Sequence, residues 1–177
     1  MDAIYRAVNK VQPSLIRVEA DEVTYNLHIL LRFELENDML DGRLKAGDVP
    51  AAWNAKVEEY LGINVPNDAL GALQDIHWSG IFFGSFPSYT LGNVIGAQLM
   101  VKIREALPDL DEQLARGEFA ALHAWLTENV YRFGRMYTPN ELLLRATGRE
   151  LSARPWIEYV ESKFGEIYDL ALGGARA

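Results

Sequence analysis

The segment SLIRVEADEVTYNLHILLRFELEN, residues 14–37, carries the first long helical pattern of the chain. One set of apolar residues recurs at steps of three and four, as on one helix face: Ile16, Ala20, Val23, Leu27 and Leu30. At about 100° per residue, a second apolar set falls on the opposite side: Val18, Tyr25 and Ile29. The pattern predicts a helix over 14–37 that lies between two layers of the fold, with polar residues along its edges.

Proline and glycine mark the limits of further helices. Pro50 suits the first turn of a helix that Gly62 ends. Thr138-Pro139-Asn140-Glu141 is a capping box, and Gly148 supplies the matching stop. Other helices are expected after Pro66, over 89–107, near 109–116 and 118–133, and from Pro155 onward. Since no strand pattern of convincing length is present, the sequence predicts an all-α fold, with one domain over 1–177.

Composition narrows the classes of partner. The formal net charge of −8 argues against binding to the phosphate backbone, so we expect no nucleic-acid partner.

The first residues, Met1–Arg6, lack the basic-then-apolar order of a secretory signal. The sequence also contains no cysteine, which suits a reducing compartment. We therefore expect a cytoplasmic protein.

Residues 76–101 contain no Asp, Glu, Lys or Arg and are numerous enough to cross a bilayer. Several polar residues, four glycines and Pro87 interrupt the stretch, so it is neither uniformly apolar nor helical throughout. We expect a buried loop that runs into a helix, and no membrane partner.

The strongest local cluster is Gly71-Ala72-Leu73-Gln74-Asp75-Ile76-His77-Trp78. A carboxylate two residues from an imidazole can hold one ring nitrogen and so prepare the other for a substrate. Alternatively, Asp75 caps a helix and His77 satisfies buried backbone groups. Both interpretations stay open at this point. Six aromatic residues are assigned to packing: Tyr5, Tyr25, Phe33, Trp53, Trp125 and Trp156.

Arg17 allows two interpretations as well. An Arg–Asp pair with Asp21 at i, i+4 usually supports a helix. An arginine held on a helix buried on two sides can instead present its planar guanidinium to a carboxylate. The spacing alone does not choose between a structural pair and an anion site.

Metal and phosphate sites find little support in the sequence. The three histidines stand at 28, 77 and 123, so the zinc motif His-Glu-x-x-His is absent. The glycines at 80, 84, 92 and 96 lack the following Lys-Ser/Thr of a phosphate-binding loop. We expect no metal ligands and no cofactor in this chain.

Two motifs resemble signature motifs of the M32 (Taq-type) metallocarboxypeptidases: Ile16-Arg17-Val18-Glu19-Ala20-Asp21 and Gly71-x-x-Gln74-Asp75-x-His77-Trp78. The resemblance extends through 25–28 and 83–93 into the last helices, and corresponds to about the C-terminal third of that family. It implies an all-α, cytoplasmic homodimer that removes residues one at a time from peptide C-termini. It also implies that the zinc of the intact enzyme is held by the two histidines of His-Glu-x-x-His and a downstream glutamate, outside the matched third.

The resemblance also implies roles for particular residues. Arg17 would contact the terminal carboxylate of the substrate, with Gln74 and Asp75 as supporting members of the same wall. His77 and Tyr89 would line the cleft near the scissile carbonyl and are the catalytic candidates.

Three hypotheses follow for function. The first is the C-terminal portion of an M32-like zinc carboxypeptidase that contributes the substrate-carboxylate wall, with the isolated chain inactive. The second is a non-catalytic module that binds peptide C-termini, serves in dimerisation or pairs with a full-length homologue. The third is a purely structural or interaction domain whose motif residues are relics. Because the 14–37 helix has two apolar faces, we also expect a homo-oligomer or pairing with a missing N-terminal portion.

Overall fold

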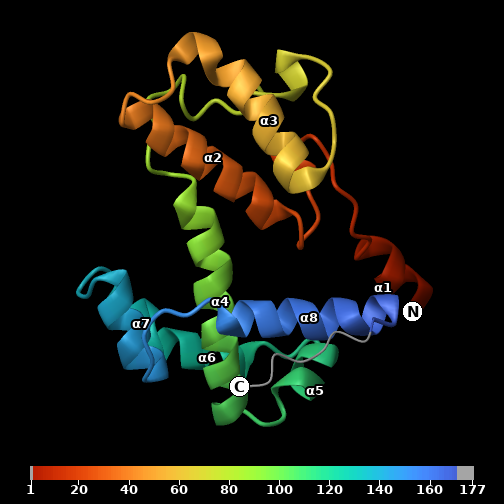
Figure 1. Ribbon diagram of the computed structural model, residues 1–177. Helices are drawn as coiled ribbons and strands as arrows, with labels where there is room; N and C mark the ends of the chain where they lie inside the picture. Colours follow the sequence, from red (N-terminus) through yellow and green to blue (C-terminus); the bar gives the residue numbers. More distant parts are fainter. Residues whose placement is uncertain (1, 171–177) are drawn as a thin grey trace. The chain divides into compact units, whose positions relative to one another are not determined.

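The computed structural model describes residues 2–170, and within that range it is built from helices and contains no strand (Figure 1). The predicted all-α class is therefore confirmed. The α-helices are α1 (Asp2–Val8), α2 (Tyr25–Leu40), α3 (Val49–Leu61), α4 (Pro87–Ala106), α5 (Leu110–Ala115), α6 (Ala120–Asn129), α7 (Pro139–Thr147) and α8 (Arg154–Tyr168). Short 3-10 helices are η1 (Arg17–Glu19), η2 (Ala46–Asp48), η3 (Asp68–Leu70) and η4 (Tyr131–Phe133).

The chain divides into two compact units, which span residues 1–90 and 91–177. We refer to them as unit 1 and unit 2. The expectation of one domain over 1–177 stays a prediction, because two compact units can belong to one domain or to two.

The predicted continuous helix over 14–37 is wrong at its beginning. Asp21 accepts hydrogen bonds at 2.9 Å from the backbone N–H groups of Val23 and Thr24, and at 2.8 Å from the Thr24 hydroxyl. Such a local side-chain turn competes with the helical ladder. Within the predicted helix, residues 14–20 form only η1, and α2 begins at Tyr25. Arg17 therefore lies outside the helix that carries His28.

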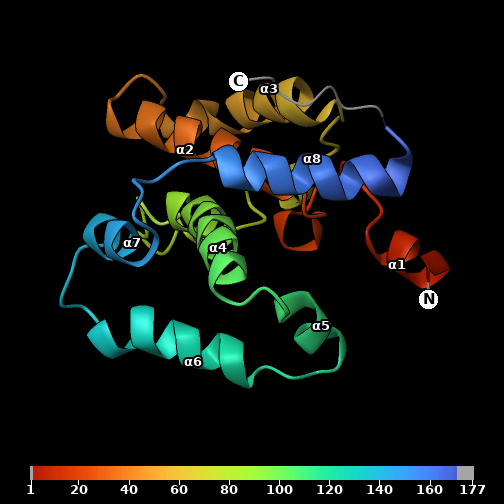
Figure 2. The same ribbon diagram turned by 90° about the horizontal axis from the view of Figure 1, so that it is seen from below.

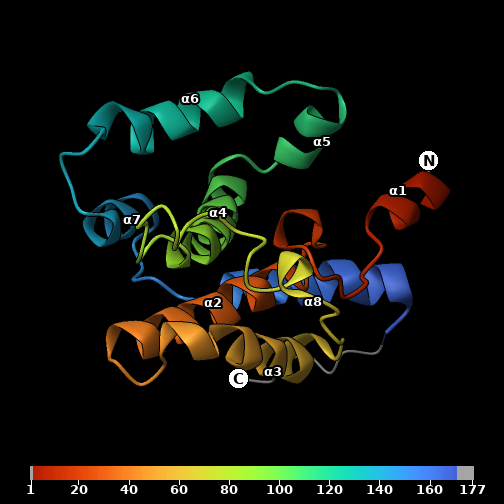
Figure 3. The same ribbon diagram turned by 90° about the horizontal axis from the view of Figure 1, so that it is seen from above.

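The core of unit 1 forms where α2 packs against α3, side by side in Figures 1 and 3. Its buried residues are Leu31, Leu35, Trp53, Val57 and Leu61. Trp53 is buried as predicted, whereas Tyr5 and Phe33 are about half exposed and do not fill the core. The predicted signals of α3 are confirmed, since proline stands in its first turn and Gly62 ends it at a φ of 67°.

Unit 2 contains most of α4 together with α5 to α8, and α7 lies beside α4 (Figures 2 and 3). The predicted capping box at Thr138 and Glu141 is confirmed, as is the stop of α7 at Gly148. Gln98 of α4 is buried and donates to the backbone oxygen of Glu150 at 2.9 Å, while it accepts from the backbone N–H of Ser152 at 3.1 Å. These bonds fix the connection between α7 and α8.

The uncharged stretch 76–101 consists of an irregular segment followed by α4, as predicted. The expected burial of the loop is wrong, because Ile81 and Phe82 are 84% and 61% exposed. No helix among the described residues combines the length and the apolar character that a membrane span requires.

Candidate functional site

Arg17 is buried in η1 and makes its contacts with residues far along the chain. Its Nε and Nη2 donate to Asp75 Oδ1 at 3.2 and 2.7 Å. Its Nη1 donates to the hydroxyl of Tyr25 at 3.1 Å, so Tyr25 does more than pack. The backbone N–H of Arg17 donates to Gln74 Oε1 at 3.0 Å. The interpretation of Arg17 as the helical partner of Asp21 is therefore wrong.

A second arginine, Arg32 of α2, meets the same two side chains and was not among the predicted site residues. Its Nε donates to Asp75 Oδ2 at 2.6 Å, and its Nη2 donates to Gln74 Oε1 at 2.8 Å. Its Nη1 donates to the backbone oxygen of His28 at 2.7 Å. The guanidinium also stacks on Trp53, with 4.5 Å between Cζ and the ring centroid. Arg32 is fully buried.

Arg17, Arg32 and Asp75, which we call the arginine cluster, contain two cations and one carboxylate. Burial alone would raise the pKa of Asp75, but the hydrogen bonds and charges of the two arginines outweigh it and hold that pKa below its ordinary value. Burial lowers the pKa of Arg32 to about 10, so its guanidinium stays charged at neutral pH. The cluster therefore carries an excess of one positive charge.

His77 and Tyr89 lie next to the arginine cluster. His77 Nε2 is 3.3 Å from the Tyr89 hydroxyl, and the His77 ring packs on Phe86 with 4.4 Å between centroids. Arg17 Cζ is 5.2 Å from the Tyr89 ring centroid. His77 Nδ1 is 3.7 Å from Asp75 Oδ1, which is beyond hydrogen-bond distance. Asp75 thus neither fixes His77 by a hydrogen bond nor caps a helix, and it pairs with the arginines instead.

The structure brings all five predicted site residues together in unit 1: Arg17, Gln74, Asp75, His77 and Tyr89. Their exposed fraction increases from Arg17 to Tyr89. The side chains of Arg17 and His77 are 8% and 17% exposed, and Tyr89 is 40% exposed, at the rim of the site. The described contacts use three of the five N–H groups of Arg17. The other two N–H groups have no acceptor among the described contacts, and the roles of the five residues stay predictions.

Three polar residues of α2 are buried, His28, Arg32 and Glu36. Sequence reasoning placed His28 on the same polar edge as Arg17 and missed the other two. The three residues are spaced i, i+4, i+8, and therefore share one face of the helix. The available signal was that Arg32 and Glu36 directly follow two leucines that are four positions apart, Leu31 and Leu35. A charged side chain on a buried face needs a partner. Interpreting 14–37 as one helix directed attention to the edge that carries Arg17.

A metal site needs several ligands close together. Among residues 2–170, no group of three or more His, Cys, Asp or Glu side chains is placed to hold a metal ion. The donors that this part of the chain offers therefore do not fit a catalytic zinc on their own.

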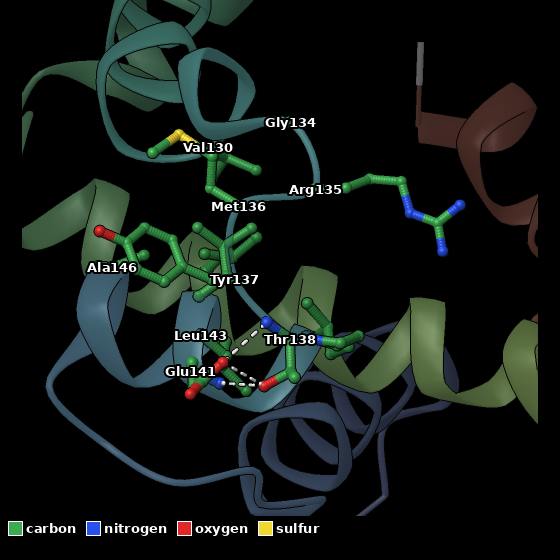
Figure 4. Close-up of a pocket in the computed structure, with 13 residues that line it drawn as sticks. Val130, Gly134, Arg135, Met136, Tyr137, Thr138, Glu141, Leu143 and Ala146 are labelled. Carbon is green, nitrogen blue, oxygen red and sulfur yellow. Dashed lines mark hydrogen bonds between the residues drawn. The ribbon is translucent and has the colours of Figure 1, made fainter.

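Unit 2 contains a cavity of about 600 Å³, lined by Ile95 and Leu99 of α4, by Val130 and by residues of 134–146 (Figure 4). Thr138 and Glu141 hydrogen-bond to each other in the capping box, as the dashed lines show. None of the predicted site residues lines this cavity. We therefore place the candidate site in unit 1.

The fold and the site together define an all-helical protein in which two arginines share one carboxylate in unit 1. A family model described as "Carboxypeptidase Taq (M32) metallopeptidase" matches residues 1–164. The chain belongs to this family, the M32 metallopeptidases.

Known relatives of this chain agree with this assignment. Carboxypeptidase 1 of Bacillus subtilis is 46% identical over 95% of this chain, and thermostable carboxypeptidase 1 of Thermus thermophilus is 45% identical over 95%. The crystal structure of an M32 carboxypeptidase from Deinococcus radiodurans is 51% identical over 94% of the chain, with a TM-score of 0.89. The chain covers 34%, 33% and 34% of these three proteins, so it spans about a third of their length.

Proposed function

We propose that this chain supplies the wall of an M32-type carboxypeptidase that binds the C-terminal carboxylate of a peptide. The observation that carries the proposal is the arginine cluster, in which two guanidinium groups face one carboxylate. A peptide carboxylate would neutralise the excess charge and accept hydrogen bonds from the two remaining Arg17 donors. The substrate class is therefore peptides with a free C-terminus.

His77 and Tyr89 complete the proposed site at its open rim. An imidazole and a phenol can each donate a hydrogen bond to a carbonyl oxygen. Their mutual distance of 3.3 Å and the position of Tyr89 against Arg17 support a shared peptide-facing surface. We propose that Arg17 holds the terminal carboxylate while these two side chains contact the adjacent peptide group.

Arg17→Ala is expected to weaken binding of a free-carboxylate peptide roughly tenfold to hundredfold, because it removes a charge-assisted contact. The matching peptide amide should bind weakly to both proteins. Titration calorimetry with the two peptides measures the difference. The control is Arg43→Ala, which removes an exposed arginine of the same unit that pairs with Asp38.

Two results would contradict the proposed carboxylate site. One is equal affinity of the unchanged chain for the acid and the amide. The other is a loss of thermal stability in Arg17→Ala with no change in peptide affinity, as expected if Arg17 is only structural.

Hydrolysis itself is proposed to need a further polypeptide that carries the zinc ligands. A bound zinc ion polarises a carbonyl and activates water, and the sequence lacks the His-Glu-x-x-His ligands for it. We predict that the chain purified without added metal contains no stoichiometric zinc and releases no residue from a blocked dipeptide. Metal analysis and amino-acid release measure this. Stoichiometric zinc with turnover that a chelator abolishes would overturn the prediction.

We also propose that the chain associates with itself in the cytoplasm. Leu30, Phe33 and Leu40 of α2 are 42%, 42% and 63% exposed, so α2 presents apolar side chains that a second copy of the chain could cover. Light scattering should show a mass that rises with concentration above that of one chain. A strict monomer over a wide range of concentration would contradict the proposal.

A further inference from the structure

We propose that Arg32 and Glu36, one helical turn apart on α2, are positioning residues that hold residues 74–84 on both sides of His77. We call residues 74–84 the His77 segment. The inference rests on the proposed function in one respect only, since it takes His77 to face the peptide.

Arg32 holds the beginning of the segment. Its guanidinium donates to Asp75 at 2.6 Å and to Gln74 at 2.8 Å, so one planar group fixes two consecutive side chains. Stacking on Trp53 of α3 restricts the guanidinium from another direction. Because Arg32 is fully buried and packs on Trp53 of the α2–α3 core, the beginning of the segment is tied to that core.

Glu36 holds the segment beyond His77. Its Oε1 accepts from the backbone N–H of Gly84, and its Oε2 accepts from Trp78 Nε1 at 3.4 Å. Glu36 is only 2% exposed, and a carboxylate buried to that extent lowers stability unless donors satisfy it. Both of its described donors belong to the His77 segment. The position of the segment is therefore coupled to the position of α2.

The part of the segment between Trp78 and Gly84 has little packing of its own. Ile81 is 84% exposed and has a φ of 61°, a conformation that a β-branched residue rarely adopts. Phe82 is 61% exposed. Backbone turns such as Phe82 N–H to the His77 oxygen, at 2.8 Å, give this stretch its local shape. The hydrogen bonds from Glu36 join it to α2. His77 lies between the two attachments, with its ring on Phe86.

The test uses the ring signals of His77 in NMR spectra of the full chain, which contains only three histidines. Glu36→Leu removes both acceptors and is expected to shift or broaden the His77 signals. Glu36→Gln keeps one amide oxygen as an acceptor and should cause a smaller change. His123, an exposed histidine of unit 2, reports in the same spectra whether unit 2 remains folded.

Glu34→Leu is the matched control, because it makes the same change on α2 at a residue that bonds to Tyr60 and Lys56 and not to the segment. The His77 signals should stay unchanged in this variant. Peptide affinity should fall roughly tenfold in Glu36→Leu, because a displaced His77 would lose about one hydrogen bond to the peptide group.

Unchanged His77 signals in both Glu36 variants would overturn the positioning role, even if Arg17→Ala had confirmed the carboxylate site. If Glu36→Leu does not fold, the Glu36→Gln spectra decide alone. If the unchanged chain binds no peptide, the proposed function fails, and the NMR comparison still decides the role of Glu36.

Discussion

Asp75→Ala is expected to lower the free energy of unfolding by about 3–5 kcal/mol, the scale measured when one partner of a buried ion pair is removed. Asp75 is the described carboxylate that both arginines share, at 2.7 Å from Arg17 and 2.6 Å from Arg32. Without it, two guanidinium groups lie close together with their charges uncompensated. Urea denaturation followed by tryptophan fluorescence measures the loss.

Asp111→Ala provides the control for this prediction. Asp111 also pairs with an arginine, Arg104, at 3.0 Å, but its side chain is 67% exposed. Exposed pairs contribute only about 0–1 kcal/mol, because water solvates both charges well. Equal losses in the two variants would show that the arginine cluster is no more than a surface ion pair. Asp75→Asn, which keeps oxygen acceptors without the charge, should fall between them.

Local signals in the sequence predicted several element ends correctly. The capping box at Thr138 and the glycines at 62 and 148 act within four or five residues, and the structure confirms each of them. The hydrogen bonds and backbone conformations that end these helices involve only residues of the segment that carries the signal. A single sequence therefore predicts such ends without knowledge of the rest of the fold.

Hydrophobic periodicity alone did not find where α2 begins. The apolar spacing continues through 14–24, but the Asp21 side chain occupies the backbone N–H groups of Val23 and Thr24. Periodicity does not report such competition between a side chain and the helical ladder. The error placed Arg17 beside Asp21, whereas the structure pairs it with Asp75.

The candidate site was only partly predictable because its contacts join distant parts of the chain. Arg17 meets Asp75 across 58 positions, and Arg32 meets Asp75 across 43. The motif resemblance placed Arg17, Asp75 and His77 in one wall, which spacing alone could not do. Arg32 and Glu36 lie outside the two quoted motifs, and their partners are determined only by tertiary packing.

Acidification from pH 6.5 to 4 is expected to cost the protein about 3 kcal/mol of stability through His28. His28 is 1% exposed, and burial, followed by the charges of Arg32 and Arg17, lowers its pKa from 6.5 to about 4. The charges of Asp75 and Asp21 oppose this shift without cancelling it.

The sign follows from which state binds the proton. Well above pH 6.5 the His28 imidazole is neutral in both the folded and the unfolded chain, so it adds no pH dependence there. Between pH 6.5 and about 4 the unfolded chain takes up a proton that the folded chain does not, which favours unfolding. The low pKa of Asp75 places its own loss of stability at more acidic pH.

His28→Gln is expected to remove this part of the pH dependence, since glutamine stays neutral throughout. Among the described contacts, His28 Nε2 has no hydrogen-bond partner, so the substitution removes no bond at that atom. Urea denaturation at pH 7, 5.5 and 4.5 should show that the free energy of unfolding depends less on pH in His28→Gln than in the unchanged chain.

His123→Gln, at an exposed histidine, is the control and should retain the pH dependence of the unchanged chain. Carboxylates that titrate in this range do so in all three proteins, and their effect cancels in the comparison. Parallel curves for His28→Gln and the unchanged chain would mean that His28 takes up its proton as readily in the folded state as in the unfolded state.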